Sequence, residues 1–209
     1  IARAICHLGH VPYEDVYYSS RFLEGAILVF LKKVGIVAPN KVRANRDLMG
    51  GNDKFAGAYV QDPQKGKHEW VYDLDITSMY PSIIMSLNIS PETKLGKLDS
   101  WDVEPFLKGV DRTYTIKDKN GKESAKLTTG EFQNFLKDNN VSISSNGVLY
   151  TQDRKGLIPT LLEKWFDDRV QFRKLAKKFA DEGDKEKYSY FDRRQYIQKV
   201  VLNSLYGVL

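Results

Sequence analysis

The sequence predicts an α+β fold, and two regions of contrasting periodicity carry this prediction. Two long segments, residues 158–181 and 185–206, repeat apolar residues at the 3.6-residue spacing of a helix. Two shorter runs, 57–61 and 68–76, are rich in β-branched and aromatic residues and are separated by turn residues. We therefore expect a partial antiparallel sheet beside a long antiparallel helical hairpin.

Composition narrows the possible classes of protein. The chain has 209 residues and 42% apolar residues, enough for one domain with a core or for two small ones. Its net charge of +5 is a modest basic excess that is compatible with a polyanionic partner. A single cysteine, Cys6, excludes an internal disulfide and argues against a Cys/His zinc site. No apolar run reaches the length of a membrane span, so we expect no membrane partner.

The chain divides into three expected regions, of which the first two are residues 1–54 and 55–157. The first is a helical segment that leads into a polar loop. Ser19 or Ser20 can cap a helix with an apolar stripe, and Gly35 can end that helix. The second region is expected to contain the sheet together with an insertion.

Residues 92–150 are the least informative part of the sequence, and no chemistry is assigned to them. Their patterns indicate short helices at 101–107 and 128–139, and either a hairpin tip or a flexible loop at 117–122. A strand, turn and second strand are expected over 141–151.

The stretch VYDLDITSMYPSIIMSLNIS, residues 71–90, organises the rest of the chain. It has the pattern of a strand that ends in carboxylates, followed by a turn and a helix with Pro81 in its first turn. Asp73 and Asp75 share one face of the alternation. A carboxylate there can hold a divalent cation, and the free N–H groups of a helix N-terminus can face a phosphate. Asp75 can equally be a turn or cap residue, so both interpretations stay open on local physics.

The third expected region, residues 158–209, is the helical hairpin. Its first helix carries Arg169 and Arg173 one turn apart along the edge of the apolar stripe. A basic stripe of this kind is more often a solvated face than a binding site. The second helix places three residues on one face by i, i+4, i+7 spacing: Lys199, Asn203 and Tyr206.

Two motifs resemble those of family B DNA polymerases. DITSMYPSI, residues 75–83, is similar to motif A of that family, Asp-x-x-Ser-Leu/Met-Tyr-Pro-Ser-Ile. KVVLNSLYG, residues 199–207, is similar to motif B, Lys-x-x-x-Asn-Ser-x-Tyr-Gly, and it follows in the expected order. The segments NISPET (88–93) and NGVLYTQDRKGLIPT (146–160) resemble most closely the replicative polymerases of tailed bacteriophages. The resemblance implies that 55–157 is a partial palm and that the hairpin is the fingers.

The resemblance also implies roles in the template-directed transfer of a deoxynucleotide to a primer 3′ end. Asp75 would be catalytic and would ligate two Mg²⁺ ions, and the Ile76 carbonyl would ligate one. Lys199 would be the second catalytic residue, because it would protonate the leaving pyrophosphate. The nucleotide-binding residues would be Ser78, Met79, Tyr80, Arg169, Arg173, Lys199 and Asn203. The base-pair pocket would contain Asn203, Tyr206 and Gly207, and the template contacts would be Phe55, Gly57 and Ala58.

One feature of the family is absent from this sequence. The second catalytic carboxylate of the family lies in an Asp-Thr-Asp motif downstream of motif B, and no such motif occurs here. We therefore expect the chain alone to bind nucleotide weakly and to polymerise undetectably. It would need the C-terminal palm and thumb, in cis or in trans.

The other partners that the resemblance implies are primer–template DNA, dNTP and a sliding clamp, in the cytoplasm of an infected bacterial host. A different class of function stays open beside the enzyme. In a non-catalytic nucleic-acid-binding module, the basic helices would contact phosphates without any need for Mg²⁺ or dNTP.

Overall fold

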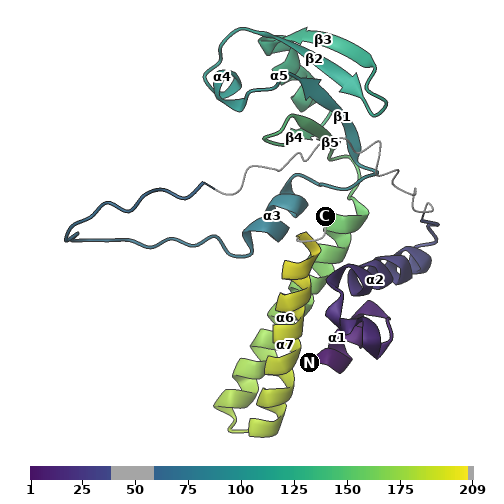
Figure 1. Ribbon diagram of the computed structural model, residues 1–209, viewed down its shortest axis with the longest axis vertical. Helices are drawn as coiled ribbons and strands as arrows, with labels where there is room; N and C mark the ends of the chain where they lie inside the picture. The colour runs from purple at the N-terminus through teal and green to yellow at the C-terminus, as the bar shows by residue number, and fades with distance from the viewer. Residues whose placement is uncertain (39–58, 207–209) are drawn as a thin grey trace.

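The computed structural model describes residues 1–38 and 59–206 and arranges them as a helical part and a sheet-bearing part (Figure 1). The expected template contacts at Phe55, Gly57 and Ala58, and the pocket residue Gly207, lie outside the described residues. The helices are α1 Ala2–Gly9, η1 Tyr13–Tyr17 (a 3₁₀ helix), α2 Ser19–Lys33, α3 Met79–Ser86, α4 Val103–Leu107, α5 Thr129–Asp138, α6 Leu157–Asp181 and α7 Lys185–Tyr206. The strands are β1 Lys94–Asp99, β2 Thr113–Asp118, β3 Glu123–Thr128, β4 Val141–Ile143 and β5 Val148–Thr151.

The predicted helical hairpin is confirmed by α6 and α7, which pack against each other along their length (Figure 1). The rings of Phe179 and Phe191 stack at 5.5 Å between the two helices. At the joint, Asp184 accepts a hydrogen bond from the Lys187 backbone N–H at 3.0 Å and so caps α7. No helix in the described ranges is long and apolar enough to cross a membrane.

One apolar core joins α1, α2 and α3 to the hairpin. The predicted helix near the start is confirmed as α2, and Gly35 follows its end with a positive φ of 74°. The short helix α3 enters the same core through Ile84. The buried residues of this core are Ile5, Phe22, Leu23, Ala26, Ile84, Leu161, Leu162, Trp165, Ile197, Val201, Leu202 and Leu205.

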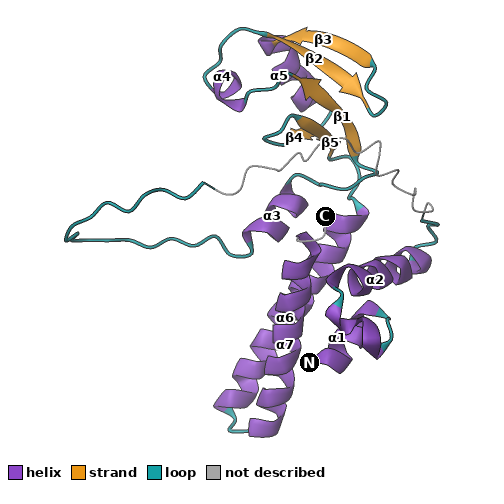
Figure 2. Ribbon diagram, viewed as in Figure 1, coloured by secondary structure: helices purple, strands orange, loops and turns teal. Residues whose placement is uncertain are grey.

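The sheet has five antiparallel strands in the order β3-β2-β1-β5-β4, with α5 packed against them (Figure 2). The expected short helices, hairpin tip and strand–turn–strand within residues 92–151 are therefore confirmed. The turn between β4 and β5 contains Gly147 at a φ of 80°, as the sequence Asn-Gly favours. This unit has its own buried core, made of Leu98, Tyr114, Ile116, Phe132 and Leu149.

The fold class is confirmed, but the prediction of strands within 57–61 and 68–76 is wrong for the residues described. From 59 to 78 the chain contains no strand and runs as an extended excursion ahead of α3 (Figure 1). A strand needs a neighbour for its backbone N–H and C=O groups, and its apolar face needs cover. Neither is supplied by the described residues, and the side chains of Trp70 and Leu74 are 90% and 92% exposed.

Candidate functional site

The short helix α3, which carries most of the motif A residues, lies against the open end of the hairpin. Figure 1 shows it beside the C-terminal end of α7, and α3 contacts both α6 and α7. Ile84 of α3 is buried in one core with Leu161 of α6 and Leu205 of α7. The motif A helix and the motif B helix therefore belong to one packed body.

The N-terminal end of α3 is available to an anion. Ser78, the N-cap residue, has a φ of 51°, and its side chain makes no cap hydrogen bond with the described residues. The first hydrogen bond to the helix start runs from the Ser82 N–H to the Ser78 carbonyl at 3.0 Å. The N–H groups of Ser78 and Met79 precede this bond, at the positive end of the helix dipole. Met79 and Tyr80 are both partly exposed, at 40% and 48%.

Asp75 and Ile76 lie in the extended excursion just before α3, and both are exposed. Asp75 makes no hydrogen bond or ion pair with any described residue. Across residues 1–38 and 59–206, no three His, Cys, Asp or Glu side chains gather in a way that could hold a metal ion.

Arg169 and Arg173 form a close pair of cations on α6. Burial, followed by the charge of Arg173, lowers the pKa of the Arg169 guanidinium, which nevertheless stays a cation at neutral pH. The Arg169 Nε–H is buried and has no hydrogen-bond partner among the described residues. A partly desolvated cation beside a second one would be stabilised by an anion.

The third expected cation, Lys199, lies on α7, which packs against α6. The Arg194 guanidinium of α7 lies 5.7 Å from the centroid of the Phe172 ring of α6, so these two residues face each other across the hairpin. Arg169 precedes Phe172 by three residues on α6, and Lys199 follows Arg194 by five residues on α7, so both lie on the side of this contact that is nearer the open end of the hairpin. Lys199 and Asn203 are exposed on a shared face. Tyr206 is the last residue of α7, and its side chain lies outside the described part.

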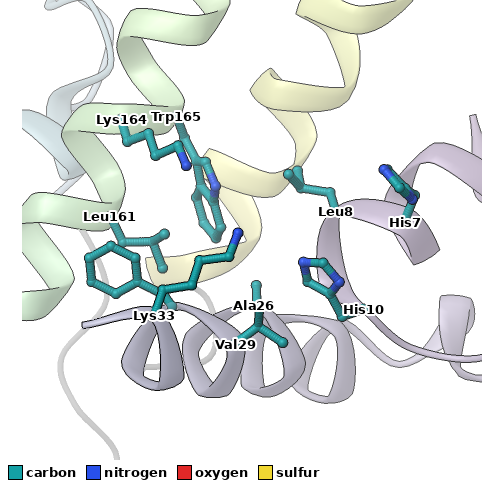
Figure 3. Close-up of a pocket in the computed structure, with 10 residues that line it drawn as sticks. His7, Leu8, His10, Ala26, Val29, Lys33, Leu161, Lys164 and Trp165 are labelled. Carbon is teal, nitrogen blue, oxygen red and sulfur yellow. The ribbon is translucent and has the colours of Figure 1, made fainter. Parts of the chain in front are cut away.

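A separate pocket of about 240 Å³ lies between α1, α2 and α6 (Figure 3). It is lined by none of the expected site residues. The side chains of His7, His10, Lys33 and Lys164 surround it, over an apolar floor that includes Trp165.

The residues just after α3 form a polar cluster to which the sequence analysis assigned no chemistry. Asn88, only 3% exposed, accepts a hydrogen bond from the Gly156 N–H at 2.7 Å. Its amide donates to the carbonyls of Thr151 at 2.6 Å and Arg154 at 2.8 Å. An asparagine directly after a helix is a sequence signal for a left-handed residue, and Asn88 has a φ of 57°. Nothing in the local sequence, however, indicates partners more than sixty residues away.

Comparison with known proteins places these features in a family. The profile described as "DNA polymerase family B" matches residues 16–209. The DNA polymerase of Pyrococcus glycovorans is 28% identical over 172 residues, which are 82% of this chain and 17% of that protein. The DNA-directed DNA polymerase of Enterobacteria phage T4 is 30% identical over 132 residues, 63% of this chain and 12% of that protein.

A solved structure supports the fold independently. The structure of the family B DNA polymerase from Pyrobaculum calidifontis superposes with a TM-score of 0.60 at 23% identity, over 99% of this chain and 22% of that one. The chain thus spans between about a tenth and a fifth of the length of the relatives it matches. Because the family profile covers nearly the whole chain, including the helical hairpin and the segment before it, the chain belongs to DNA polymerase family B.

Proposed function

We propose that this chain is the part of a family B DNA polymerase that holds the incoming deoxynucleotide for transfer to a primer 3′ end. The observation that carries this proposal is the packing of α3 onto the hairpin, whose cationic residues include Arg169, Arg173 and Lys199. This packing gives motif A and motif B a common frame, although about 120 residues separate them in the sequence.

The triphosphate is the group that these residues suit best. The Ser78 and Met79 N–H groups would donate to its oxygens at the end of α3. Arg169 and Arg173 would neutralise its charge, and the unpartnered Arg169 Nε–H supports this role. Tyr80, beside them on α3, would lie under the sugar and exclude a 2′-hydroxyl.

In the reaction, the primer 3′ hydroxyl loses its proton to water, and its oxygen bonds to the α-phosphorus while the bond to the bridging oxygen of pyrophosphate breaks. Lys199 would give its proton to the departing pyrophosphate. Asp75 and the Ile76 carbonyl would contribute ligands for Mg²⁺, which supplies charge stabilisation when it is bound. Further ligands for Mg²⁺ would come from another part of the polymerase.

Motif resemblance alone supports the remaining assignments. Asn203, Tyr206 and Gly207 would line the nascent base pair, and Phe55, Gly57 and Ala58 would touch the template. Residues 55–157 would belong to the palm and 158–209 to the fingers. Primer–template DNA, dNTP and a sliding clamp would be the partners. An infected bacterial host as the setting stays a prediction, since both phage and archaeal polymerases are among the relatives.

The exposed excursion supports a need for further palm structure. Its apolar side chains, Tyr72 and Leu74 among them, are solvent-exposed in the described part of the chain. The C-terminal palm and thumb, in cis or in trans, would provide neighbouring strands and the missing carboxylate. We therefore expect no primer extension by this chain alone, and robust synthesis in that assay would contradict the expectation.

The test of the site is a titration of dNTP into the chain with and without Mg²⁺. Asp75→Ala and Lys199→Ala should each weaken Mg²⁺-dependent binding by about tenfold, because each removes one charge-assisted interaction. Asp73→Ala, two residues away in the same excursion, and Lys185→Ala, at the far end of α7, are the matched controls and should have little effect.

Two outcomes would count against the proposal. An affinity for dNTP that neither Asp75→Ala nor Lys199→Ala weakens would show that the site is not assembled as described. Binding of DNA that is steeply salt-dependent, and indifferent to Mg²⁺ and dNTP, would instead favour the non-catalytic nucleic-acid-binding module.

A further inference from the structure

The N-terminus of α6 is capped by side chains from a distant part of the chain. Gly156, Leu157 and Ile158 have backbone N–H groups that precede the intrahelical ladder, whose first bond runs from the Thr160 N–H to the Gly156 carbonyl at 3.0 Å. Pro159 has no N–H to satisfy. The Gly156 N–H donates to Asn88 Oδ1 at 2.7 Å, the Leu157 N–H to Glu92 Oε1 at 2.5 Å, and the Ile158 N–H to Ser90 Oγ at 3.4 Å.

These three side chains are themselves fixed by further hydrogen bonds. The Ser90 hydroxyl lies 2.8 Å from both carboxylate oxygens of Glu92 and donates to that carboxylate. The Arg154 guanidinium donates to the backbone carbonyl of Glu92 at 3.1 Å, which ties the main chain at Glu92, rather than its side chain, to the segment before α6. The Asn88 amide donates to two carbonyls of the segment before α6. Asn88 and Ser90 are 3% and 2% exposed, so water cannot easily replace these bonds.

We call Asn88, Ser90 and Glu92, with the N–H groups of residues 156–158, the junction. The junction begins immediately after α3, whose last turn is closed by a bond from the Ile89 N–H to the Ile84 carbonyl at 2.9 Å. The end of α3 and the beginning of α6 therefore share one hydrogen-bond cluster. Neither helix can move far from the other without breaking it.

The approach of the two segments is close enough to require a glycine. A Cβ built on Gly156 would lie 2.7 Å from the Ser90 Cβ and 3.2 Å from Asn88 Oδ1. The negative charge of Glu92 also lies at the positive end of the α6 dipole, where a carboxylate is favourable. Contact geometry and electrostatics thus both fit a capping role.

We propose that Asn88, Ser90 and Glu92 are positioning residues for nucleotide binding, an inference that rests on the proposed function. They fix α3 relative to α6, so that the N-terminal end of α3 and the arginines of α6 can bind the same triphosphate. They do not touch the nucleotide themselves.

The test compares junction variants with a matched cap elsewhere in the chain. Asn88→Ala and Glu92→Ala each remove one capping acceptor, and Glu92→Gln keeps an acceptor oxygen at the same position. The control is Glu131→Ala, which removes the capping box of α5, where the Glu131 carboxylate accepts from the Thr128 N–H at 2.8 Å. That cap lies in the sheet unit, on a helix that does not pack against α3.

Two readouts separate positioning from general stability. The first is the distance between spin labels at Ser86 on α3 and Lys174 on α6, both exposed, in a Cys6→Ala background. The second is the affinity of the folded protein for Mg²⁺–dNTP. Asn88→Ala and Glu92→Ala should broaden the distance distribution and weaken binding about three- to tenfold. Glu92→Gln should restore both, and Glu131→Ala should change neither.

The outcomes distinguish this proposal from the proposed function. An unchanged distance distribution in folded Asn88→Ala and Glu92→Ala would overturn the positioning role, whatever the affinity. A changed distance with unchanged affinity would overturn its link to nucleotide binding. If the unsubstituted chain binds no nucleotide, the proposed function fails, and the distances still decide whether the junction sets the position of α3. If Asn88→Ala does not fold, the distance distributions of Glu92→Ala and Glu92→Gln decide whether the junction sets the position of α3.

Discussion

Two segments of this chain have nearly the same strand-like pattern and opposite structural outcomes. Residues 71–76 read VYDLDI, and β2 reads TYTIKD, so both place an aromatic and an aliphatic residue on one face. In β2, Tyr114 and Ile116 are 4% and 7% exposed. In the excursion, Tyr72 and Leu74 are 85% and 92% exposed, and no strand forms.

The difference lies in the neighbours of each segment. β2 is paired on both sides, and Ile116 stands opposite Leu98 of β1 and Ala125 of β3. Phe132 of α5 covers the same face, with its ring centroid 5.2 Å from that of Tyr114. Alternation therefore gives a segment the capacity to form a strand, and partners on its edges and face decide whether it does.

The largest expected effect is the removal of the cover over β2. Phe132→Ala empties a fully buried site and should lower the free energy of unfolding of the sheet unit by about 3–5 kcal/mol. Hydrogen exchange measures the protection of amides in each core separately. Amides of β1, β2 and β3 should lose protection, whereas those of α6 and α7 should keep theirs. Equal loss in both would show that the two cores unfold as one unit.

A smaller effect is expected where the sheet unit joins the helices. Gly156→Ala should cost about 1–3 kcal/mol, because the new methyl group overlaps Ser90. The matched control is Gly130→Ala in α5, where the new Cβ would meet nothing within 4 Å among the described atoms. That control should stabilise α5 by roughly 0.5–1 kcal/mol. Denaturant titration measures the change in the free energy of unfolding for each variant. Changes of the same sign in Gly156→Ala and Gly130→Ala would contradict the close packing at the junction.

The α5 cap gives the stability of the sheet unit a dependence on pH. Hydrogen bonds from the Thr128 backbone N–H, and then from its hydroxyl, lower the pKa of Glu131. A carboxylate with a lowered folded-state pKa stabilises the fold above its unfolded pKa of about 4.3 and loses this contribution as pH falls through the folded value. The protection factors of the α5 amides, which compare the measured exchange rate with the intrinsic rate at each pH, should therefore fall in that acidic range. Glu131→Gln should flatten this step, and an unchanged profile would contradict the assignment.

The smallest expected effect lies in the excursion itself. Leu74→Ala should change the free energy of unfolding of this chain by less than about 0.5 kcal/mol, because the side chain is exposed. Denaturant titration is the measurement, with Phe132→Ala as the positive reference. A loss above about 1 kcal/mol would show that Leu74 is covered in solution and that the two segments differ less than described.

Much of the fold could be predicted because its signals are local. The stripe that includes Leu161 and Trp165 predicted α6, and the Asn146-Gly147 turn predicted the pairing of β4 with β5. The candidate site was predictable only as separate motifs. Arg169 and Lys199 lie on the expected helices, whereas Asp75 lies in an exposed segment without a described partner.

The junction shows why other parts of the fold could not be predicted from the sequence. The three acceptors and the three N–H groups that they cap are 65 to 68 residues apart in the chain. Helix capping usually follows from residues next to the helix, and α6 begins after Gly156, which has no side chain to offer. Only the folded chain brings Asn88 to that position.

The sequence by itself determined the helices, the turns and the order of the two polymerase motifs, because each depends on residues within a few positions of one another. Tertiary structure alone decided which alternating segment became a strand and which side chains cap α6. It also decided that α3 shares a core with the hairpin. These outcomes depend on contacts between residues that are distant in the chain. Burial and hydrogen bonding stabilise such contacts only after the backbone has brought the residues together.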